Sequence, residues 1–597
     1  MATMLANRWK TLVGAALIVL AAAVAVGPSV AHGPSYGGSD FDFHFTSWID
    51  AEQSFAHGVV YPRWANFANH GAGEPRFIFY PPLSWMLGGF LGLVLPWSLT
   101  PTVFIFLMLA ATGLAIWALA REGLEDGPAV LAGCIAIYFG YALFTIYRRS
   151  AYAELSGGFW IPMLLLFALR NRKPEGRFWE RVLDGSATPL ALIVAGAWLS
   201  NGPVGLMASF LLMAIAATSS WMQRSVAPLV RAALSATVGI GLTAIYLLPA
   251  EWERGWASIN QAVTFDGQRV ENSWLFAHHV FNPYLYAHDL MLEKASSVAV
   301  LMFVATLAGG LIAWIRETLP GEKRWWVPLA LIPVAVLPLQ FPFSLPVWNT
   351  VPMMRYIQFP WRWLLVLESP MAIFLAAGVW NAPMRRRIAV IATSAVVFAA
   401  ILLFAERNWF IDARESMAEM VQSIHDGDGS SGKSEYAPPG VRHPYLVEDL
   451  PKTCLIGNIY NVTADGMLVT PKWFQTPDAC GGKFEMTENE PGSRRFTGYA
   501  DHDAFLILPL RAYPAWHAEV NGTPVTAYHE SQYGLMTVSV PQGKVDVSFK
   551  WTTTKDMVVG HILSGAFVLL LGALAWWERR LARRPVVEKV VVEPAAG

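Results

Sequence analysis

Apolar runs long enough to cross a lipid bilayer recur along most of this chain, and they constrain its fold more than any other feature. A spanning helix needs about 20 predominantly apolar residues. Only 15% of the 597 residues are charged and the mean hydropathy is +0.38, whereas a soluble protein of this size needs more charge to cover its surface. The candidate spans cover residues 11–31, 101–120, 128–147, 156–170, 187–200, 204–218, 228–249, 297–315, 326–342, 362–380, 388–404 and 556–577. The sequence therefore predicts a polytopic α-helical membrane protein with about 12 spans.

The first apolar run begins at Thr11, after Arg8 and Lys10, and is followed by Ala31-His32-Gly33. Cleaved signal peptides share this arrangement, but the run is long for their apolar region. We interpret it as an uncleaved first span. The chain would be polytopic in either case.

Basic residues in short loops predict the orientation, because Lys and Arg are enriched on the cytoplasmic side. Three basic groups meet this description: Arg170 to Lys173 with Arg177 and Arg181, Arg385 to Arg387, and Arg579 to Arg584. With the N-terminus inside, all three are cytoplasmic only if the apolar stretch 82–97 does not fully cross. We therefore predict a re-entrant or interfacial helix there and both termini in the cytoplasm. The alternative is one more crossing, with one basic loop on the outer side.

The segment between the last two spans is the only outer segment large enough for a domain. Apolar and polar residues alternate over 504–508 and 545–551, and turn signals such as Asn521-Gly522 lie between these runs, as in β-strands. The predicted organisation begins with a transmembrane core (1–404, with outer loops 32–81 and 250–296) and a linker (405–444), in which the stretch 425–440 is rich in Gly, Ser, Asp and Pro. An extracytoplasmic β-sandwich (445–555), a last transmembrane helix (556–577) and a basic cytoplasmic tail (578–597) follow.

The chain has three cysteines, which excludes a disulfide-dense scaffold. Cys454 and Cys480 both lie in the predicted extracytoplasmic domain, whereas Cys134 lies in a span. Disulfides form and persist in oxidising compartments. We therefore predict a disulfide between Cys454 and Cys480.

Arginines also occur in the predicted outer loops, where the orientation rule expects few. Those near the membrane boundary are Arg63, Arg76, Arg148, Arg149, Arg355 and Arg362, and the carboxylates that accompany them are Asp40, Asp42, Glu52, Glu74, Glu154, Glu251 and Glu253. Any single one is also explained by an interfacial ion pair or a snorkelling side chain. Charged groups at the boundary are costly unless they are paired or used, so the set as a whole indicates function.

Arginine beside carboxylate at one face is the charge complement that a sugar-phosphate transfer needs. A carboxylate takes the proton of the acceptor hydroxyl, and guanidinium groups hold the departing phosphate. A divalent metal between two carboxylates is an optional addition that the sequence does not decide. A net charge of −1 gives no indication of nucleic-acid binding.

The best acidic element is Ser39-Asp-Phe-Asp-Phe-His44, directly after the first span. In an extended segment Asp40, Asp42 and His44 would project to one side, whereas the alternative is a turn with a solvated face. His278, His279 and His288-Asp289 have the composition of a metal site without a diagnostic spacing, so we interpret them as ordinary loop residues.

Several motifs, taken together, resemble a known family. They are Asp42-Phe-His44, Gly58-Val-Val-Tyr-Pro-Arg-Trp64, Gly71-Ala-Gly-Glu-Pro75, Phe79-Tyr-Pro-Pro-Leu83, Tyr147-Arg-Arg149 with Glu154, and Ile357-Gln-Phe-Pro-Trp-Arg-Trp363. The set resembles the bacterial membrane family labelled 6-pyruvoyl-tetrahydropterin synthase-related, within the GT-C superfamily of integral-membrane glycosyltransferases. The stretch 513–522 is similar to the extracytoplasmic domain of related glycosyltransferase-like proteins. We set the pterin part of the label aside, because that chemistry uses a small soluble zinc enzyme and no such domain is found in the sequence.

The resemblance implies a GT-C glycosyltransferase of the bacterial inner membrane. It would move a sugar from a polyprenyl-phosphate donor to a glycan, lipid or protein acceptor at the outer face. In GT-C enzymes an acidic residue of the first outer loop is the usual base, and a second acidic motif lies in a later outer loop. These positions match Asp40 or Asp42, with the choice between them open, and Glu154. The residues expected to bind the substrate are His44, Arg63, Arg76, Tyr80, Arg148, Arg149, Arg355 and Arg362.

A non-catalytic membrane protein for the transport or assembly of envelope polysaccharide is the alternative. A transporter is expected to place ionisable residues within its spans. The predicted spans contain almost none, and the charges gather at one face, which favours the enzyme. We expect Asp40, Asp42, Arg63, Glu154 and Arg362 to converge on one outward-facing cavity.

Overall fold

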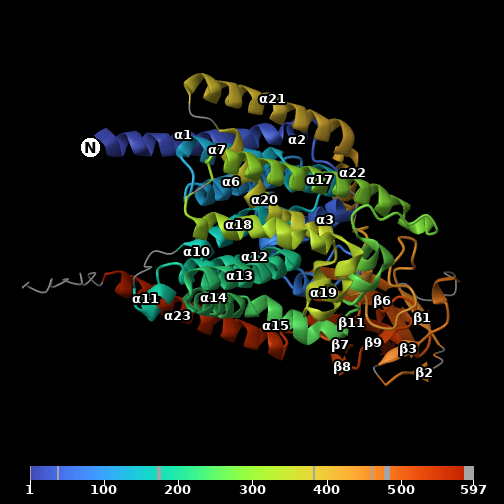
Figure 1. Cartoon of the computed structure of the whole chain (residues 1–597). Helices are drawn as coiled ribbons and strands as arrows, with labels where there is room; N and C mark the ends of the chain where they lie inside the picture. The colour runs from blue at the N-terminus through green and yellow to red at the C-terminus, as the bar shows by residue number, and fades with distance from the viewer. Residues whose placement is uncertain are drawn as a thin grey trace, which may run out of the picture.

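Long helices lie side by side in this protein, and a β-rich unit covers one end of them (Figure 1). The computed structural model describes residues 2–36, 39–170, 176–319, 321–380, 383–457, 459, 461–464, 466–475, 480 and 484–583. Two of the predicted basic segments, 171–173 and 584–597, therefore lie outside the described residues. The start of α1 (Ala2–Ala25) and the end of α23 (Lys555–Ala582) lie at the end of the bundle opposite the strands (Figure 1).

The helices of the bundle coincide with the predicted apolar runs. Besides α1 and α23, the bundle contains α6 (Thr100–Ala120), α7 (Asp126–Tyr138), α10 (Gly157–Leu169), α12 (Ala187–Ser200), α13 (Gly202–Gln223), α14 (Ala227–Leu242), α15 (Ala244–Trp252), α17 (Tyr286–Ile315), α18 (Lys323–Val336), α20 (Leu364–Val379) and α21 (Met384–Trp409). Shorter helices are α2 (Gly27–His32), α4 (Arg76–Phe79), α8 (Tyr141–Phe144), α9 (Tyr152–Leu155), α11 (Phe178–Val182), α16 (Gln261–Thr264) and α19 (Leu345–Thr350).

Nine helices of the described residues are long and apolar enough to cross a membrane, or up to eleven if each of two bent pairs is one span. One pair joins Ala227–Leu242 to Ala244–Trp256 with a bend of 72°, and the other joins Lys323–Gln340 to Pro342–Thr350 with a bend of 97°. Pro342 accounts for the second break, because proline lacks the N–H that a continuous helix needs. The predicted run 187–200 forms α12, whose 14 residues are fewer than a lone span requires.

The stretch 82–97, predicted not to cross fully, forms α5 (Pro82–Val94). Its 13 residues extend about 20 Å, which is less than the hydrocarbon core of a bilayer. It packs closely on α3 (Ser39–Ala56) because glycine leaves room at the crossing. A Cβ at Gly88 would lie 2.2 Å from the ring of Trp48.

Helix α3 corrects one expectation, since Asp40, Asp42 and His44 do not lie on an extended segment. They occupy the first turns of a helix, where carboxylates are stabilised by the positive end of the helix dipole. Side chains four positions apart share a helix face, whereas those two positions apart do not. Asp40 and His44 therefore lie on one face, and Asp42 points elsewhere.

The C-terminal unit consists of two antiparallel-rich sheets. One has the order β1-β6-β10-β9-β3-β2 and the other β4-β5-β11-β7-β8. Apolar side chains from both sheets, such as Leu506, Val538 and Phe549, share one buried core. Cys454 and Cys480 are joined by a disulfide with their Cα atoms 4.4 Å apart. The strands are β1 (Cys454–Ile456), β2 (Asn461–Val462), β3 (Met467–Val469), β4 (Phe484–Glu490), β5 (Ser493–Ala500), β6 (Ala504–Arg511), β7 (Trp516–Val520), β8 (Thr523–Val525), β9 (Tyr528–Glu530), β10 (Leu535–Val540) and β11 (Gly543–Trp551).

The segment predicted as a linker is structured. It contains the end of α21, helix α22 (Arg414–His425) and a stretch over 428–436 that we call the strap. The strap pairs with the loop of residues 57–75, through Ser430 N–H to the carbonyl of Phe67 at 2.7 Å and His70 N–H to the carbonyl of Ser430 at 2.9 Å. This loop thus lies between the helical bundle and the β-rich unit.

Buried arginines of the β-rich unit contact the same loop. Arg494 donates to the side chain of Asn66 at 2.8 Å, and Arg511 donates to that of Asn69 at 3.1 Å. Both arginines are completely buried. The β-rich unit is therefore fastened to the bundle by specific hydrogen bonds at this loop.

Candidate functional site

A cavity of about 850 Å³ lies where α3, α13, α15 and the strap meet. This volume is in the range of ligand-binding pockets. Both charge signs line it, with the cations Arg254, Arg362 and Lys433 and the carboxylates Asp40, Glu154, Glu251 and Glu435. Five of the residues predicted from sequence contribute to the lining, namely Asp40, His44, Tyr80, Glu154 and Arg362.

Glu154 is the centre of a buried ion cluster in the cavity wall. Its Oε2 accepts from Nη1 of Arg149 at 2.9 Å and from Nε of Arg362 at 3.1 Å, and its Oε1 accepts from the hydroxyl of Tyr141 at 2.5 Å. The carboxylate is 1% exposed. Asp40 is a second carboxylate beside Arg149, so two guanidinium groups and two carboxylates stand together at this place.

Irregular backbone brings these side chains together from distant parts of the chain. Arg149 ends the π-helical turn η1 (Thr145–Arg149), and Ser150 then takes a left-handed conformation with φ of 52°. Such π turns are often found at functional sites. Arg362 lies in the 3₁₀ turn η9 (Pro360–Trp363), directly before α20. The rings of Trp361 and Phe359 lie within 4.4 and 4.7 Å of the Arg149 and Arg362 guanidinium carbons and orient them.

Asp40 is the accessible carboxylate beside this cluster. Its side chain is 48% exposed, and its Oδ2 lies 3.8 Å from Nη2 of Arg149. That distance is at the limit of an ion pair, so the oxygen keeps capacity to accept a proton or a hydrogen bond. Asp40 thus combines access to the cavity with a nearby cation.

His44 lies one helical turn from Asp40 and is 4% exposed. Burial lowers the pKa of His44 to about 4, because a charged imidazole would lose its hydration; nearby Asp40 opposes this shift and Lys433 adds to it. The ring is therefore neutral near pH 7. It stacks on Tyr152 with the centroids 5.7 Å apart, while burial raises the pKa of the neighbouring Tyr80.

Asp42 does not line the cavity. Its Oδ2 accepts from the hydroxyl of Tyr36 at 2.9 Å, and its backbone carbonyl accepts from Thr46. Burial raises the pKa of Asp42. Sequence left open which aspartate faces the substrate, and the helical geometry of α3 favours Asp40.

Five predicted binding residues are not part of the cavity lining, and one of them, Arg149, belongs to the buried Glu154 cluster. Arg63 donates to the carbonyl of Ile245, with its guanidinium over the ring of Tyr61. Arg355 pairs with Glu271 at 2.6 Å. Arg76, which pairs with Glu74, and Arg148 also do not contribute to the lining. The expected convergence thus holds for Asp40, Glu154 and Arg362 but is wrong for Asp42 and Arg63.

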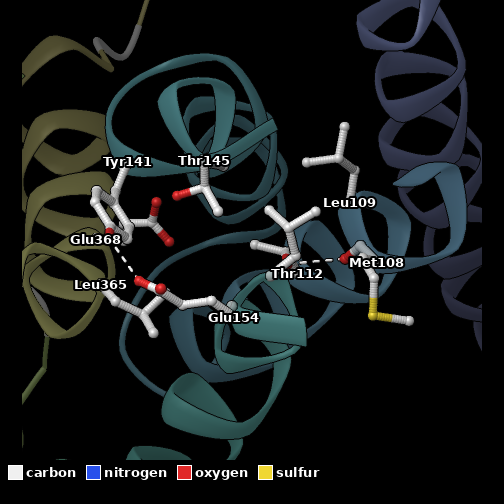
Figure 2. A pocket seen from close by; sticks show the side chains of 11 residues that line it. Met108, Leu109, Thr112, Tyr141, Thr145, Glu154, Leu365 and Glu368 are labelled. Carbon is white, nitrogen blue, oxygen red and sulfur yellow. Dashed lines mark hydrogen bonds between the residues drawn. The ribbon is translucent and has the colours of Figure 1, made fainter. Parts of the chain in front are cut away.

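A second, much smaller pocket of about 10 Å³ lies beside Glu154 and Tyr141, between helices of the bundle (Figure 2). Glu154, Tyr141, Thr145 and Glu368 line it, and its volume suits a single water. Glu368 lies within α20 and is 2% exposed. The expectation that the spans contain almost no ionisable residue overlooked this glutamate, because a single acid hardly changes the hydropathy of its run.

Sequence reasoning missed several residues of the site. Tyr141 carries no signal of its own, because an aromatic residue in a span is ordinary core. Lys433 lies in a segment whose Gly and Ser content is typical of a linker. Arg254 and Gln358 line the cavity from two further outer segments. That these residues meet at one cavity cannot be predicted without the tertiary structure.

The described residues contain no group of three or more His, Cys, Asp or Glu side chains that could hold a metal ion. Nδ1 of His279 donates to the carboxylate of Asp289 at 2.5 Å, and His278 lies 3.4 Å from the same carboxylate. These side chains form a local ion-pair cluster outside the cavity lining.

The comparisons with known proteins agree with the predicted fold class. The sequence profile of the family described as "6-pyruvoyl-tetrahydropterin synthase related domain; membrane protein" matches residues 77–410, more than half of the chain. The profile match confirms the family resemblance seen in the motifs. The structure shows the predicted helical bundle and the C-terminal β-rich unit.

No curated protein matches the chain in sequence. Among solved structures, the chain is similar to the archaeal oligosaccharyltransferase AglB from Archaeoglobus fulgidus in complex with an inhibitory peptide and a dolichol-phosphate. The identity is 14%, the match covers 70% of this chain and 59% of that chain, and the TM-score is 0.42. A likeness at this level carries no argument about activity. On the profile match, the chain belongs to the 6-pyruvoyl-tetrahydropterin synthase related family of membrane proteins.

Proposed function

We propose that this protein is an integral-membrane glycosyltransferase that moves a sugar from a polyprenyl-phosphate donor to an acceptor hydroxyl at the outer face of the cytoplasmic membrane. The observation that carries the proposal is the wall of the large cavity. There the half-exposed carboxylate of Asp40 lies beside a glutamate that two arginines hold. Such a transfer requires a base and cations near the departing phosphate. Once Asp40 has taken the proton, its negative charge no longer offsets that of the arginines.

Asp40 is the general base in this mechanism. It takes the proton of the acceptor hydroxyl while the acceptor oxygen bonds to the anomeric carbon of the sugar. The bond from that carbon to the phosphate oxygen breaks, and its electron pair leaves with the polyprenyl phosphate. Arg149 and Arg362 stabilise the negative charge that develops on the phosphate, because their fixed positions require no reorganisation.

Glu154 is a positioning residue in this mechanism and not a second base. Both of its oxygens already accept hydrogen bonds, from Tyr141 and from the two arginines. It holds the guanidinium groups against the cavity wall. The sequence predicted a catalytic role for Glu154. We now propose an indirect role, in which it positions the two arginines.

The test is a transfer or donor-hydrolysis assay on Asp40→Asn with Asp42→Asn as its matched control. Loss of a general base typically reduces the rate by about 10²–10⁴-fold. We expect this loss for Asp40→Asn and a rate close to that of the wild type for Asp42→Asn. Equal rates for wild type and Asp40→Asn would show that Asp40 is not the general base.

Transport or assembly of envelope polysaccharide without catalysis is the second candidate. The observation that favours it is Glu368, a buried acid within a span, since such residues often belong to transport pathways. This candidate predicts binding of lipid-linked glycan with no turnover. It also predicts that Glu368→Gln abolishes movement of the glycan, whereas Asp40→Asn leaves that movement unchanged.

We further propose that the β-rich unit lies outside the cytoplasm and both termini inside. The start of α1 and the end of α23 lie together at the end opposite the strands, which supports a shared side for the termini (Figure 1). Single cysteines at Glu448 and Arg583, in a background with Cys134→Ser, test this orientation with a membrane-impermeant maleimide. On intact cells we expect labelling at position 448 and none at position 583. Labelling at both positions on intact cells would contradict the orientation.

A further inference from the structure

One wall of the large cavity comes from the strap and not from the helical bundle. The strap follows α22 and precedes the β-rich unit, so it links the two parts of the molecule. Its contribution to the lining consists of Ser431, Gly432, Lys433, Ser434, Glu435 and Tyr436. Lys433 is the one cation among these six residues.

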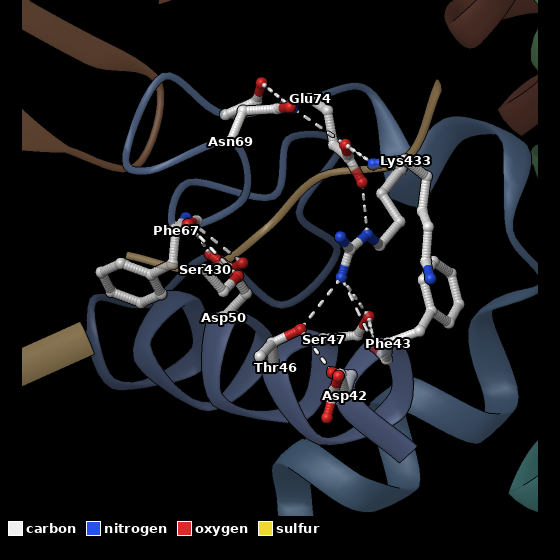
Figure 3. Close-up of polar contacts among 12 residues, drawn as sticks. Asp42, Phe43, Thr46, Ser47, Asp50, Phe67, Asn69, Glu74, Ser430 and Lys433 are labelled. Atoms are coloured by element: carbon white, nitrogen blue, oxygen red, sulfur yellow. Dashed lines mark hydrogen bonds and ion pairs between the residues drawn. The ribbon is translucent and has the colours of Figure 1, made fainter. Parts of the chain in front are cut away.

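The backbone of the strap is held rigidly at this place (Figure 3). The N–H of Lys433 donates to Oε2 of Glu74 at 3.0 Å, and Glu74 is itself paired with Arg76 at 2.7 Å. Glycine is required at two positions. Gly429 has φ of +70° and lies against the loop of residues 57–75, and a Cβ at Gly432 would lie 2.0 Å from Oδ1 of Asn69.

This anchoring places the amine of Lys433 at the face of α3 that lines the cavity. Its Nζ lies 5.7 Å from the centroid of the Phe43 ring, and Phe43 lines the cavity next to His44. The positive charge of Lys433 also opposes the effect of burial on the pKa of Asp42 and adds to the lowering of the pKa of His44. The side chain thus reaches the same region as Asp40.

We propose that Lys433 is a phosphate-binding residue of this cavity, which the strap supplies to the membrane core. This inference rests on the proposed function, because it assigns a further contact to the phosphate of the same lipid donor. Arg149 and Arg362 are fixed by Glu154, whereas a lysine carries a compact charge with three donors on a flexible stem. Lys433 can therefore offer a phosphate a positive charge and hydrogen-bond donors from the side of the cavity that the strap forms.

The experiment measures the affinity of the full-length protein in nanodiscs for two probes, a long-chain polyprenyl phosphate and the polyprenol that lacks the phosphate. We expect Lys433→Met to weaken binding of the phosphate by about 10–100-fold, the usual range for one charge-assisted hydrogen bond. Binding of the polyprenol should not change. Lys550→Met, at an exposed position of β11, is the matched control and should bind both probes like the wild type.

Restoring an amine at position 433 distinguishes the loss of a positive charge from a defect in folding. In a Cys134→Ser background, Lys433→Cys should bind the polyprenyl phosphate weakly, and aminoethylation of the new thiol should recover most of the affinity. Unchanged affinity for the phosphate in both Lys433→Met and Lys433→Cys would overturn the role of Lys433. If the wild type itself bound the two probes equally, the proposed function would fail, which is a different result from the failure of Lys433 alone.

Discussion

Two glutamate–arginine clusters in this protein have similar chemistry and different surroundings. In the cavity cluster, Glu154 accepts from both Arg149 and Arg362, and Glu154 and Arg362 line a cavity of about 850 Å³. In the enclosed cluster, Glu74 pairs with Arg76 alone, and both side chains are at most 1% exposed. The first has an accessible carboxylate beside it, since the side chain of Asp40 is 48% exposed and lies 3.8 Å from Arg149, whereas the second is closed to solvent.

The partners of the two carboxylates show what each cluster does. Glu74 also accepts from the side chain of Asn69 at 3.0 Å and from the backbone of Lys433, so it joins the loop of residues 57–75 to the strap (Figure 3). Glu154 accepts from the side chains of Tyr141, Arg149 and Arg362, and the cluster borders the cavity that Asp40 also lines. An ion pair in this protein therefore indicates function when it borders a cavity and has an accessible carboxylate beside it. An enclosed pair holds segments together.

The largest expected effect concerns the enclosed cluster. Glu74→Gln leaves the Arg76 guanidinium buried without its counter-charge, so the free energy of unfolding should fall by about 3–5 kcal/mol. Thermal unfolding in detergent measures this change, with Glu448→Gln at an exposed position as the control. A melting temperature equal to that of the wild type would show that the cluster does not hold the strap.

The transfer rate should depend on the planar shape of the Arg362 guanidinium and not only on its charge. Arg362→Lys keeps the charge but removes the planar fork, so we expect transfer to be about 10-fold slower with little change in stability. Arg63→Lys is the matched control, because Arg63 lies outside the cavity lining and should leave the transfer rate unchanged. Equal losses in both variants would contradict the distinction between the two arginines.

A smaller effect depends on pH and on Asp50, which lies near the enclosed cluster. Burial raises the pKa of Asp50 from 3.8 to about 7, although Arg76 and the backbone N–H groups of Phe67 and Asn66 oppose the shift. The folded state thus binds a proton that the unfolded state releases above pH 3.8. The contribution of Asp50 to stability is complete below that value and is lost as the pH rises through about 7.

The free energy of unfolding should therefore decrease by on the order of 1 kcal/mol per pH unit across this window. Unfolding curves between pH 5 and pH 8 measure the slope. Asp50→Asn removes the titrating group and should flatten the dependence. A slope that persists in Asp50→Asn would assign the pH dependence to another group.

The apolar runs alone indicated the helical bundle, since the cost of exposing backbone polar groups to lipid favours helix in each run. They did not indicate the break between Leu242 and Ala244, where the run 228–249 bends by 72°. The alternation of apolar and polar residues over 504–508 and 545–551 likewise determined strands β6 and β11. Local pattern determines local structure wherever one face of an element must be buried. The pairing of Cys454 with Cys480 followed from their being the only two cysteines in one predicted domain.

The composition of the site was decided by tertiary structure. The sequence indicated which charged residues stand near the membrane boundary, but it could not separate Asp40 from Asp42, because that choice depends on α3 being helical and on which face meets the cavity. It also placed Arg63 and Arg362 together, although their side chains have different surroundings. Lys433 was hidden in a segment that is typical of a linker, because its position depends on hydrogen bonds to Glu74, which lies 359 residues away in the chain. Contacts between such distant segments have no local signature, and only the folded chain brings them into one site.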